Sequence, residues 1–213
     1  MRLRCNSVLR GLIGKKIGMT RIFDDSGKAI PVTILEAGPC QITQVKTVDK
    51  DGYDSVQVGF NEAKEKHLTK PLLGHFKKNS VSPKRILAEF GKVPHFNYRA
   101  GQEFNVSLFK EGDFVTVSGR SKGHGFSGTV KKYSFSQQRK THGQGDTHRH
   151  VGSIGAASYP SRVFPGKKMP GRYGNKKVSL KSLEIIKVDK KNNQLLIKGS
   201  VPGSTNAIVM ITR

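Results

Sequence analysis

The sequence predicts a mainly β protein: a closed or nearly closed β-barrel with a small helical insertion and a long, extended basic loop. Three observations lead to this prediction. Short runs of β-branched and aliphatic residues recur between turn signals over most of the 213 residues. The rhythm becomes helical within residues 61–101. A stretch of 59 residues, 119–177, contains 13 Lys/Arg but only scattered aliphatic residues.

The first expected strands cover residues 16–23, 29–36, 41–48 and 55–60. Turn signals separate them: Asp24-Asp25-Ser26-Gly27, then Gly38-Pro39, then Asp49-Lys50-Asp51-Gly52. Within residues 29–36 the alternation places Ile30, Val32 and Ile34 inward and Thr33 outward. Four strands within so short a stretch indicate one antiparallel sheet.

The helical insertion is expected at about residues 61–101. Thr69-Lys70-Pro71 has the pattern of a helix start with Pro in the first turn. Ser82-Pro83 has the same pattern, so a second short helix is expected over residues 82–90.

Strand patterns return at residues 103–108, 113–118, 178–188, 194–199 and 207–212. Closing these strands into a barrel would remove the exposed sheet edges. Expected core positions of the barrel are Ile30, Val32, Val56, Val58, Ile186 and Ile197.

We name residues 119–177 the finger, because this stretch leaves from one expected strand and returns into another. It has 11 Gly and a single acid, Asp146, and its net charge is +12. Its aliphatic residues cannot form a buried face that offsets the entropy of ordering the chain. The predicted organisation is a barrel domain, residues 1–118 with 178–213, and a finger ordered by something outside the protein.

The net charge of the chain indicates which class of partner could order the finger. The whole chain carries +23, of which the barrel domain keeps +11, so both parts should contact a polyanion. A positive charge of this size repels itself unless a partner neutralises it, and nucleic acid fits that partner better than an anionic membrane surface. No run approaches the 18 apolar residues of a spanning helix. The first residues lack the apolar segment and cleavage site of an export signal, so a cytosolic protein is expected. Cys5 and Cys40 are expected as free or buried thiols.

Two glycine motifs invite a nucleotide interpretation, which the neighbouring residues disfavour. Residues 123–128, GHGFSG, match G-x-G-x-x-G, but a dinucleotide site needs a following helix and an acid after a second strand. Residues 129–135 have no helical pattern, and Asp146 lies in a loop. Gly14-Lys15-Lys16 lacks the Ser/Thr of a phosphate loop.

Metal and catalytic interpretations of the finger are also weak. His142, His148 and His150 have no cysteine nearby and only Asp146 as a carboxylate. A nucleophile such as Ser153 or Ser158 would have no rigid triad around it. Histidines in a basic loop more plausibly donate to phosphate or 2′-hydroxyl oxygens, or stack on unpaired bases.

Nucleic-acid recognition remains. The Lys and Arg residues of the finger alternate with aromatic residues, so charge and stacking surfaces interleave. Some of these aromatics are expected to pack within the finger itself. They are Phe126, Tyr133, Phe135, Tyr159, Phe164 and Tyr173.

Specific motifs run almost from end to end of the chain. They are GLIGKKIGMT at 11–20, PLLGHF at 71–76, SKGHGF at 121–126, GTV at 128–130, THG at 141–143, HR at 148–149, GSIG at 152–155, GKKM at 166–169, Gly171, GN at 174–175 and KGSVPG at 198–203. In these motifs the chain resembles the family of the universal third protein of the large ribosomal subunit (uL3), in its bacterial form.

The resemblance implies a translation-protein-type β-barrel and a non-enzymatic structural role in the large ribosomal subunit. It implies binding of large-subunit (23S) rRNA, a part in early subunit assembly, and a finger that positions rRNA near the peptidyl transferase centre. Neighbouring large-subunit ribosomal proteins are the implied protein partners, in the cytoplasm and in the ribosome. No homo-oligomer, membrane, small-molecule substrate, cofactor or metal is expected.

The residues expected to bind rRNA combine the finger's cations with flanking positions. They are Lys15, Lys16, Arg120, Lys122, His124, Phe126, Lys131, Lys132, Arg139, Lys140, His142, His148, Arg149, His150, Arg162, Lys167, Lys168, Arg172, Lys176 and Lys177.

Three positions depart from the family pattern. His124 stands where the family commonly has Lys, and Val151 stands where it has Pro. Ala156 occupies the place of a glutamine that is modified in some bacterial relatives, so glutamine methylation does not transfer to this chain. Two alternatives remain open at this point: a free RNA chaperone or architectural protein, and a dinucleotide-dependent oxidoreductase using residues 123–128.

Overall fold

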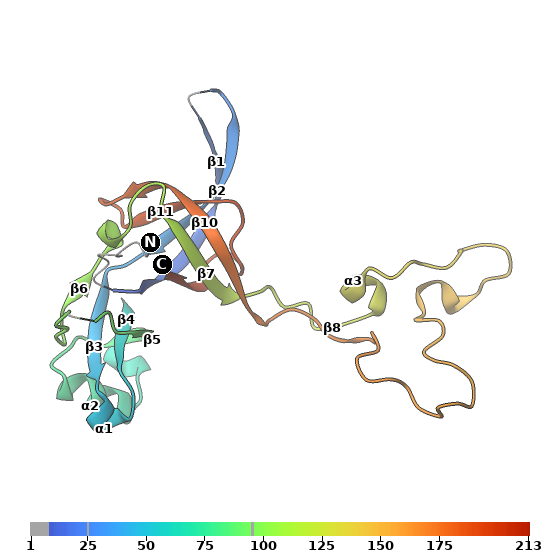
Figure 1. Cartoon of the computed structure of the whole chain (residues 1–213), viewed down its shortest axis with the longest axis horizontal. Helices are drawn as coiled ribbons and strands as arrows, with labels where there is room; N and C mark the ends of the chain where they lie inside the picture. Colours follow the sequence, from blue (N-terminus) through green and yellow to red (C-terminus); the bar gives the residue numbers. More distant parts are fainter. Residues whose placement is uncertain (1–8, 25, 95) are drawn as a thin grey trace. The chain divides into compact units, whose positions relative to one another are not determined.

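The computed structural model describes residues 9–24, 26–94 and 96–213. The chain divides into two units (Figure 1). The first unit takes the described residues up to Arg120 together with Lys177–Arg213, and the second unit is Ser121–Lys176.

Within the described residues, the first unit contains a closed barrel of six strands. Around the barrel the strands run β1 (Gly11–Phe23), β12 (Ile208–Thr212), β7 (Phe114–Arg120), β10 (Lys177–Asp189), β11 (Gln194–Lys198) and β2 (Ala29–Ala37), which pairs with β1. Every neighbouring pair is antiparallel, for example β1 with β12 from Gly11 opposite Thr212 to Lys15 opposite Ile208. The predicted mainly β fold with a closed barrel is therefore confirmed.

The predicted orientation of β2 is right for Val32 but wrong for Thr33, and the predicted core position Ile30 is only half-buried. Val32, Thr33 and Leu35 are all fully buried, whereas Ile34 is half-buried. Thr33 can face inward because its hydroxyl donates a 2.7 Å hydrogen bond to the carbonyl of Gly199. A buried polar group that finds such a partner costs little, so the hydroxyl does not have to reach solvent.

Strand β10 shows a related difference. Its pairing with β7 shifts between Leu180 and Leu183, and its pairing with β11 shifts between Ile185 and Lys187. Such an irregularity changes which side chain faces inward. Ile185 is consequently the fully buried residue, and the predicted core position Ile186 is only half-buried.

A second sheet corrects two further predictions. It has the order β5 (Lys84–Gly91), β4 (Ser55–Glu62), β3 (Cys40–Lys46), β6 (Glu103–Phe104), so β3 and β4 pair with each other and not with the barrel strands β1 and β2. Val56 and Val58 are therefore core residues of this sheet. The chain changes sheets at Gly38-Pro39, whose peptide bond is cis.

Residues 84–91 are a strand and not the predicted helix. Lys84, Ala88 and Phe90 are buried while Arg85 and Glu89 are exposed, which is the alternation of a strand. Pro83 precedes a strand here, although Pro also commonly opens a helix. The other predicted helix is present as α2 (Lys70–Lys78), with Pro71 in its first turn.

Shorter elements complete the first unit. They are α1 (Val48–Asp51) and 3₁₀ turns at Glu65–His67 and Val106–Leu108. The 3₁₀ turn at Val106–Leu108 stands where the end of the strand predicted over residues 103–108 was expected. One apolar cluster joins the barrel interior to the second sheet. Cys40 lies in it as a free thiol whose pKa burial raises to about 12, and Cys5 lies outside the described residues.

The second unit contains little regular structure. Strands β8 (Phe126–Ser127) and β9 (Gly171–Arg172) pair antiparallel. Helix α3 (Thr129–Tyr133) follows β8 in the chain, and a 3₁₀ turn covers Asp146–Arg149. Ser127 and Thr129 are its only buried residues, and all 56 positions are described. The apolar content expected to be too small for a core indeed forms none.

Candidate nucleic-acid interface

Most of the residues expected to bind rRNA face solvent. Of the twenty, Lys16 is buried, Lys15, Lys132 and His148 are half-buried, and the remaining sixteen are exposed. Exposure on this scale leaves the ammonium, guanidinium and imidazole groups available to an external partner.

Lys16 is the exception, because its ammonium group is used inside the first unit. Its side chain is 9% exposed, and Nζ donates hydrogen bonds of 2.8 Å to the carbonyl of Val201 and 3.2 Å to that of Gly203. A buried ammonium is tolerated only when such acceptors surround it. The structure thus gives Lys16 a structural role and separates it from the other predicted residues.

The cations of the second unit have no carboxylate partners. Residues 121–176 contain 11 Lys/Arg and one acid, Asp146. Across these residues, all of which the structure describes, no Lys or Arg lies within ion-pair distance of a carboxylate. Their charge is therefore free for neutralisation by a partner.

Helix α3 helps to bring two of these cations onto one aromatic ring. Lys132 Nζ lies 5.0 Å from the centre of the Tyr133 ring, and Lys168 Nζ lies 5.8 Å from it. The ring attracts both ammonium groups through its negative face. Two lysines that are 36 positions apart in sequence are thereby brought to the same ring.

The β8–β9 pair gathers a second group. Phe126 pairs with Arg172 across it, and the rings of His124 and Tyr173 stack with centroids 4.8 Å apart. The chain turns at Gly174, where φ is +73°. Only glycine fits there, because a Cβ would lie 2.0 Å from the Lys122 carbonyl oxygen. Phe126 is 81% exposed, which leaves its ring available for stacking.

The glycine motif at residues 123–128 precedes a helix, contrary to the prediction. Gly128 is the N-cap of α3, which is five residues long. The dinucleotide interpretation still fails, since β8 is two residues long and pairs antiparallel with β9. A dinucleotide fold requires a parallel sheet with a full helix on the pyrophosphate.

The histidines show no metal-binding arrangement. Over residues 9–24, 26–94 and 96–213, no three side chains of His, Cys, Asp or Glu are grouped so that they could hold a metal ion. His142 and His150 are exposed, and His150 follows Arg149 directly in the chain, where the guanidinium charge would also disfavour a cation.

Arg120 and Lys177 lie opposite each other at the ends of β7 and β10. Like charges directly opposite in a sheet are destabilising, and both side chains are exposed. A polyanion bound at this position would relieve the repulsion.

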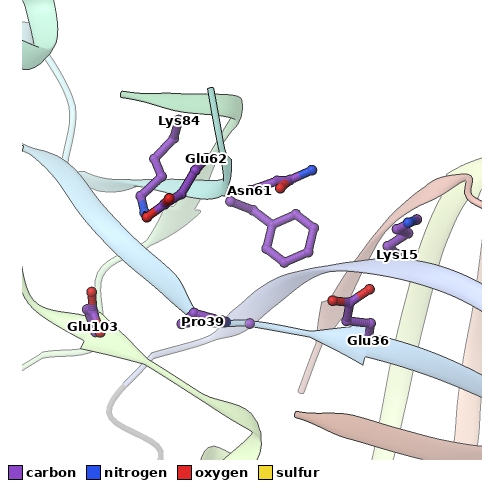
Figure 2. A pocket seen from close by; sticks show the side chains of 9 residues that line it. Lys15, Glu36, Pro39, Asn61, Glu62, Lys84 and Glu103 are labelled. Carbon is purple, nitrogen blue, oxygen red and sulfur yellow. The ribbon is translucent and has the colours of Figure 1, made fainter. Parts of the chain in front are cut away.

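The first unit has a polar hollow of about 260 Å³ whose charges largely cancel (Figure 2). Lys84 Nζ lies 3.7 Å from Glu62 Oε1, and Lys15 lies opposite Glu36 in the β1–β2 register. Glu103 adds a further negative charge. Repulsion by three carboxylates makes this hollow a poor phosphate site.

A second hollow of the first unit, about 500 Å³, places the predicted residue Lys15 beside three residues that sequence reasoning missed, Arg85, Asn61 and Asn206. Lys15, Arg85, Asn61 and Asn206 line it without a carboxylate. These residues could bind a phosphate group through two cations and two amides. No sequence signal could have found this group, because positions 15 and 85 lie on strands of two different sheets and position 206 in a turn, so they meet only in the folded unit.

Of the helices in the described ranges, none has both the length and the apolar character needed to span a lipid bilayer.

Comparison with known proteins gives concordant matches. A family model described as "Ribosomal protein L3" matches residues 92–194. The chain is 47% identical over 203 residues to "Large ribosomal subunit protein uL3" of Petrotoga mobilis, covering 95% of this chain and 94% of the relative. It is 49% identical over 203 residues to the protein of the same name from Corynebacterium urealyticum, covering 95% and 93%.

Proposed function

Because the chain belongs to the uL3 family of large-ribosomal-subunit proteins, a family of structural constituents rather than enzymes, we propose that its second unit binds large-subunit rRNA. The first unit contributes Arg120, Lys177 and the hollow at Lys15 and Arg85. In this proposal the barrel anchors the protein, and the finger, residues 119–177, is an extended element ordered by RNA.

One observation carries the proposal: the 11 Lys/Arg of the second unit have no carboxylate partner, and ten of them are exposed. A segment that keeps so much unneutralised charge beside almost no buried surface gains little by ordering itself. Phosphate groups supply both the missing counter-charge and the missing contacts.

The wider role follows from the resemblance in the motifs of the chain. We infer that the protein helps early subunit assembly and positions rRNA near the peptidyl transferase centre, where the RNA supplies the chemistry. It would act as a single copy per subunit beside neighbouring ribosomal proteins, in ribosomes of the cytoplasm.

The salt dependence of rRNA binding tests the proposal. If the unpaired cations contact phosphates, log affinity falls with log salt by about 0.7 to 0.9 per phosphate neutralised. Lys167→Gln with Lys168→Gln should therefore make the slope shallower by about one to two. The matched control removes two lysines that already have carboxylate partners, Lys92 beside Asp54 and Lys198 beside Glu184.

The control double variant should leave the slope nearly unchanged. Equal slopes for all three proteins would mean that the second unit is merely solvated. Co-sedimentation with large subunits at high salt distinguishes a ribosomal constituent from a free RNA chaperone, which would be released.

A further inference from the structure

The second unit contains an open hollow of about 370 Å³ that lies apart in sequence from the clusters at Tyr133 and at β8–β9. Residues 153–157 and 161–163 line it, and all eight are exposed. Ligand sites commonly measure about 300 to 1,000 Å³, so this hollow fits one small, flat group rather than a dinucleotide.

The loop shapes the hollow through its own hydrogen bonds. The Ser153 hydroxyl donates a 2.9 Å hydrogen bond to the carbonyl of Gly155, and the Ser161 hydroxyl donates to the carbonyl of Ser158. Because Gly155, Ala156 and Ala157 have no side chain beyond Cβ, they leave the space open. The hollow is thus a built part of the loop.

Its surroundings are suited to stacking. Ile154 and Val163 supply apolar lining and are 44% and 39% exposed. Arg162 also lines the hollow and, within the described residues, makes no hydrogen bond or ion pair. Tyr159, 88% exposed, and Phe164, 59% exposed, flank this stretch without a ring contact.

We propose that this hollow receives a single unpaired nucleobase of the bound RNA, with Arg162 stacking on the base. The inference rests on the proposed rRNA binding. A cationic ligand is disfavoured because Asp146 is the only acid in the unit, and the surrounding charge attracts nucleic acid. Protein segments recognise single-stranded RNA by splaying bases out and stacking them on aromatic rings and guanidinium planes.

Filling the hollow tests this assignment. Ala156→Leu adds a side chain to its lining, and Ser158→Leu adds the same side chain two positions away at an exposed residue outside the lining. Neither change removes a cation or enters a core. Each full-length protein is bound to saturation on deproteinised large-subunit rRNA. Unpaired bases are then probed with dimethyl sulfate and a carbodiimide.

The unchanged protein and Ser158→Leu should protect a base that stays reactive with Ala156→Leu. Loss of one stacked base should weaken binding by roughly 5- to 150-fold. The salt slope should stay the same, since no phosphate contact is lost. Arg162→Gln should expose the same base and also make the slope shallower by about one.

Identical base reactivity for the unchanged protein and Ala156→Leu would overturn the assignment. A second result would also overturn it: an Ala156→Leu protein that keeps the base footprint but, in whole subunits, loses cross-links to a ribosomal protein. A protein side chain would then occupy the hollow. Failure of the proposed function itself would look different: the unchanged protein would show no salt-dependent rRNA binding at all.

Discussion

The two units of this chain differ in how many apolar side chains they bury. In the described residues, every buried apolar side chain belongs to the first unit, including fully buried Leu12, Leu35, Ile185 and Ile211. The second unit buries only Ser127 and Thr129, and the Thr129 hydroxyl has no hydrogen-bond partner. The first unit buries an apolar core that offsets its conformational entropy, whereas the second has only the β8–β9 pair and a few ring contacts to do so.

The same contrast holds for charge. In the first unit Lys46, Lys92, Lys198 and Arg213 lie within 3.1 Å of carboxylates. In the second unit no cation has such a partner. A basic composition therefore has two meanings within one chain: some cations have carboxylate partners in the fold, and others have none. Exposure alone does not separate the two groups, but the presence of a carboxylate does.

The strongest way to break this comparison is to remove the middle of the second unit. We would replace residues 136–165 by a Gly/Ser linker of the same length, which removes Arg139, Lys140, Arg149 and Arg162. Thermal unfolding of the first unit should be unchanged, while the salt slope of rRNA binding becomes shallower by about three. Reconstituted subunits should form peptide bonds more slowly, because the RNA loses a positioning element.

A linker that carries four lysines is the matched control for this replacement. It should restore the slope but not the rate of peptidyl transfer. Equal rates for the unchanged and linker proteins at equal occupancy would show that residues 136–165 serve assembly alone.

A core substitution gives the next largest effect. Leu35→Ala in β2 should lower the free energy of unfolding by about 2 to 5 kcal/mol, because Leu35 is fully buried. Phe164→Ala in the second unit is the control: Phe164 is 59% exposed, so unfolding should be unchanged while rRNA affinity falls. Chemical denaturation and filter binding measure both quantities. A destabilised Phe164→Ala protein would reveal a hidden core in the second unit.

The neighbouring lysines of β1 test whether burial decides the role of a cation. Lys16→Met leaves the carbonyls of Val201 and Gly203 without their donor and should cost about 1 to 3 kcal/mol of stability. It should not alter the salt slope. Lys15→Met should do the reverse, making the slope shallower by about one with little effect on unfolding. A change of slope in Lys16→Met would return Lys16 to the interface.

The smallest expected effect concerns pH. Hydrogen bonds from Lys46, and also from Tyr53 and Ser55, hold the pKa of Glu89 below its usual value. A lowered pKa in the folded state means stability that is present above the unfolded value and is lost as pH falls through the folded one. As the pH falls from about 5 to 3, the free energy of unfolding should decrease more for the unchanged protein than for Glu89→Gln. The difference between the two decreases should be under about 1 kcal/mol.

Thermal unfolding of both proteins across that pH range provides the measurement. The second unit has no ion pair, so it should add no loss of ion pairs to the pH dependence in this range. Parallel curves for the two proteins would mean that the contacts of Glu89 contribute nothing.

Local sequence patterns predicted most strands of the fold but not how they are shared between sheets. Alternation and turn residues located β2, β4 and β11, and Pro71 marked α2. The assignment of β3 and β4 to a separate sheet follows from long-range packing after Gly38-Pro39, which no local pattern contains. Residues 84–91 did carry an alternating pattern, but Pro83 was given the meaning it has at a helix start.

For the candidate site, composition predicted exposure where contacts are few. The solvent-facing position of most cations of residues 121–176 could be predicted because nothing in that stretch could bury or pair them. Lys16 could not be excluded from sequence, since its partners lie 185 and 187 positions away and meet it only when the barrel closes. The group formed by Lys15, Arg85 and Asn206 was invisible for the same reason.

The strand order of the barrel also bears on biosynthesis. Strand β12 (Ile208–Thr212) closes the barrel between β1 and β7, and it follows the whole second unit in the chain. During synthesis, the edges of β1 and β7 that pair with β12 must therefore stay unpaired until residues 121–207, which include the whole second unit, have been made. Non-local pairing of this kind is slow to form. The nascent protein thus exposes its basic segment before the barrel can close, so, if that segment binds RNA as proposed, contact can begin while the barrel is still open.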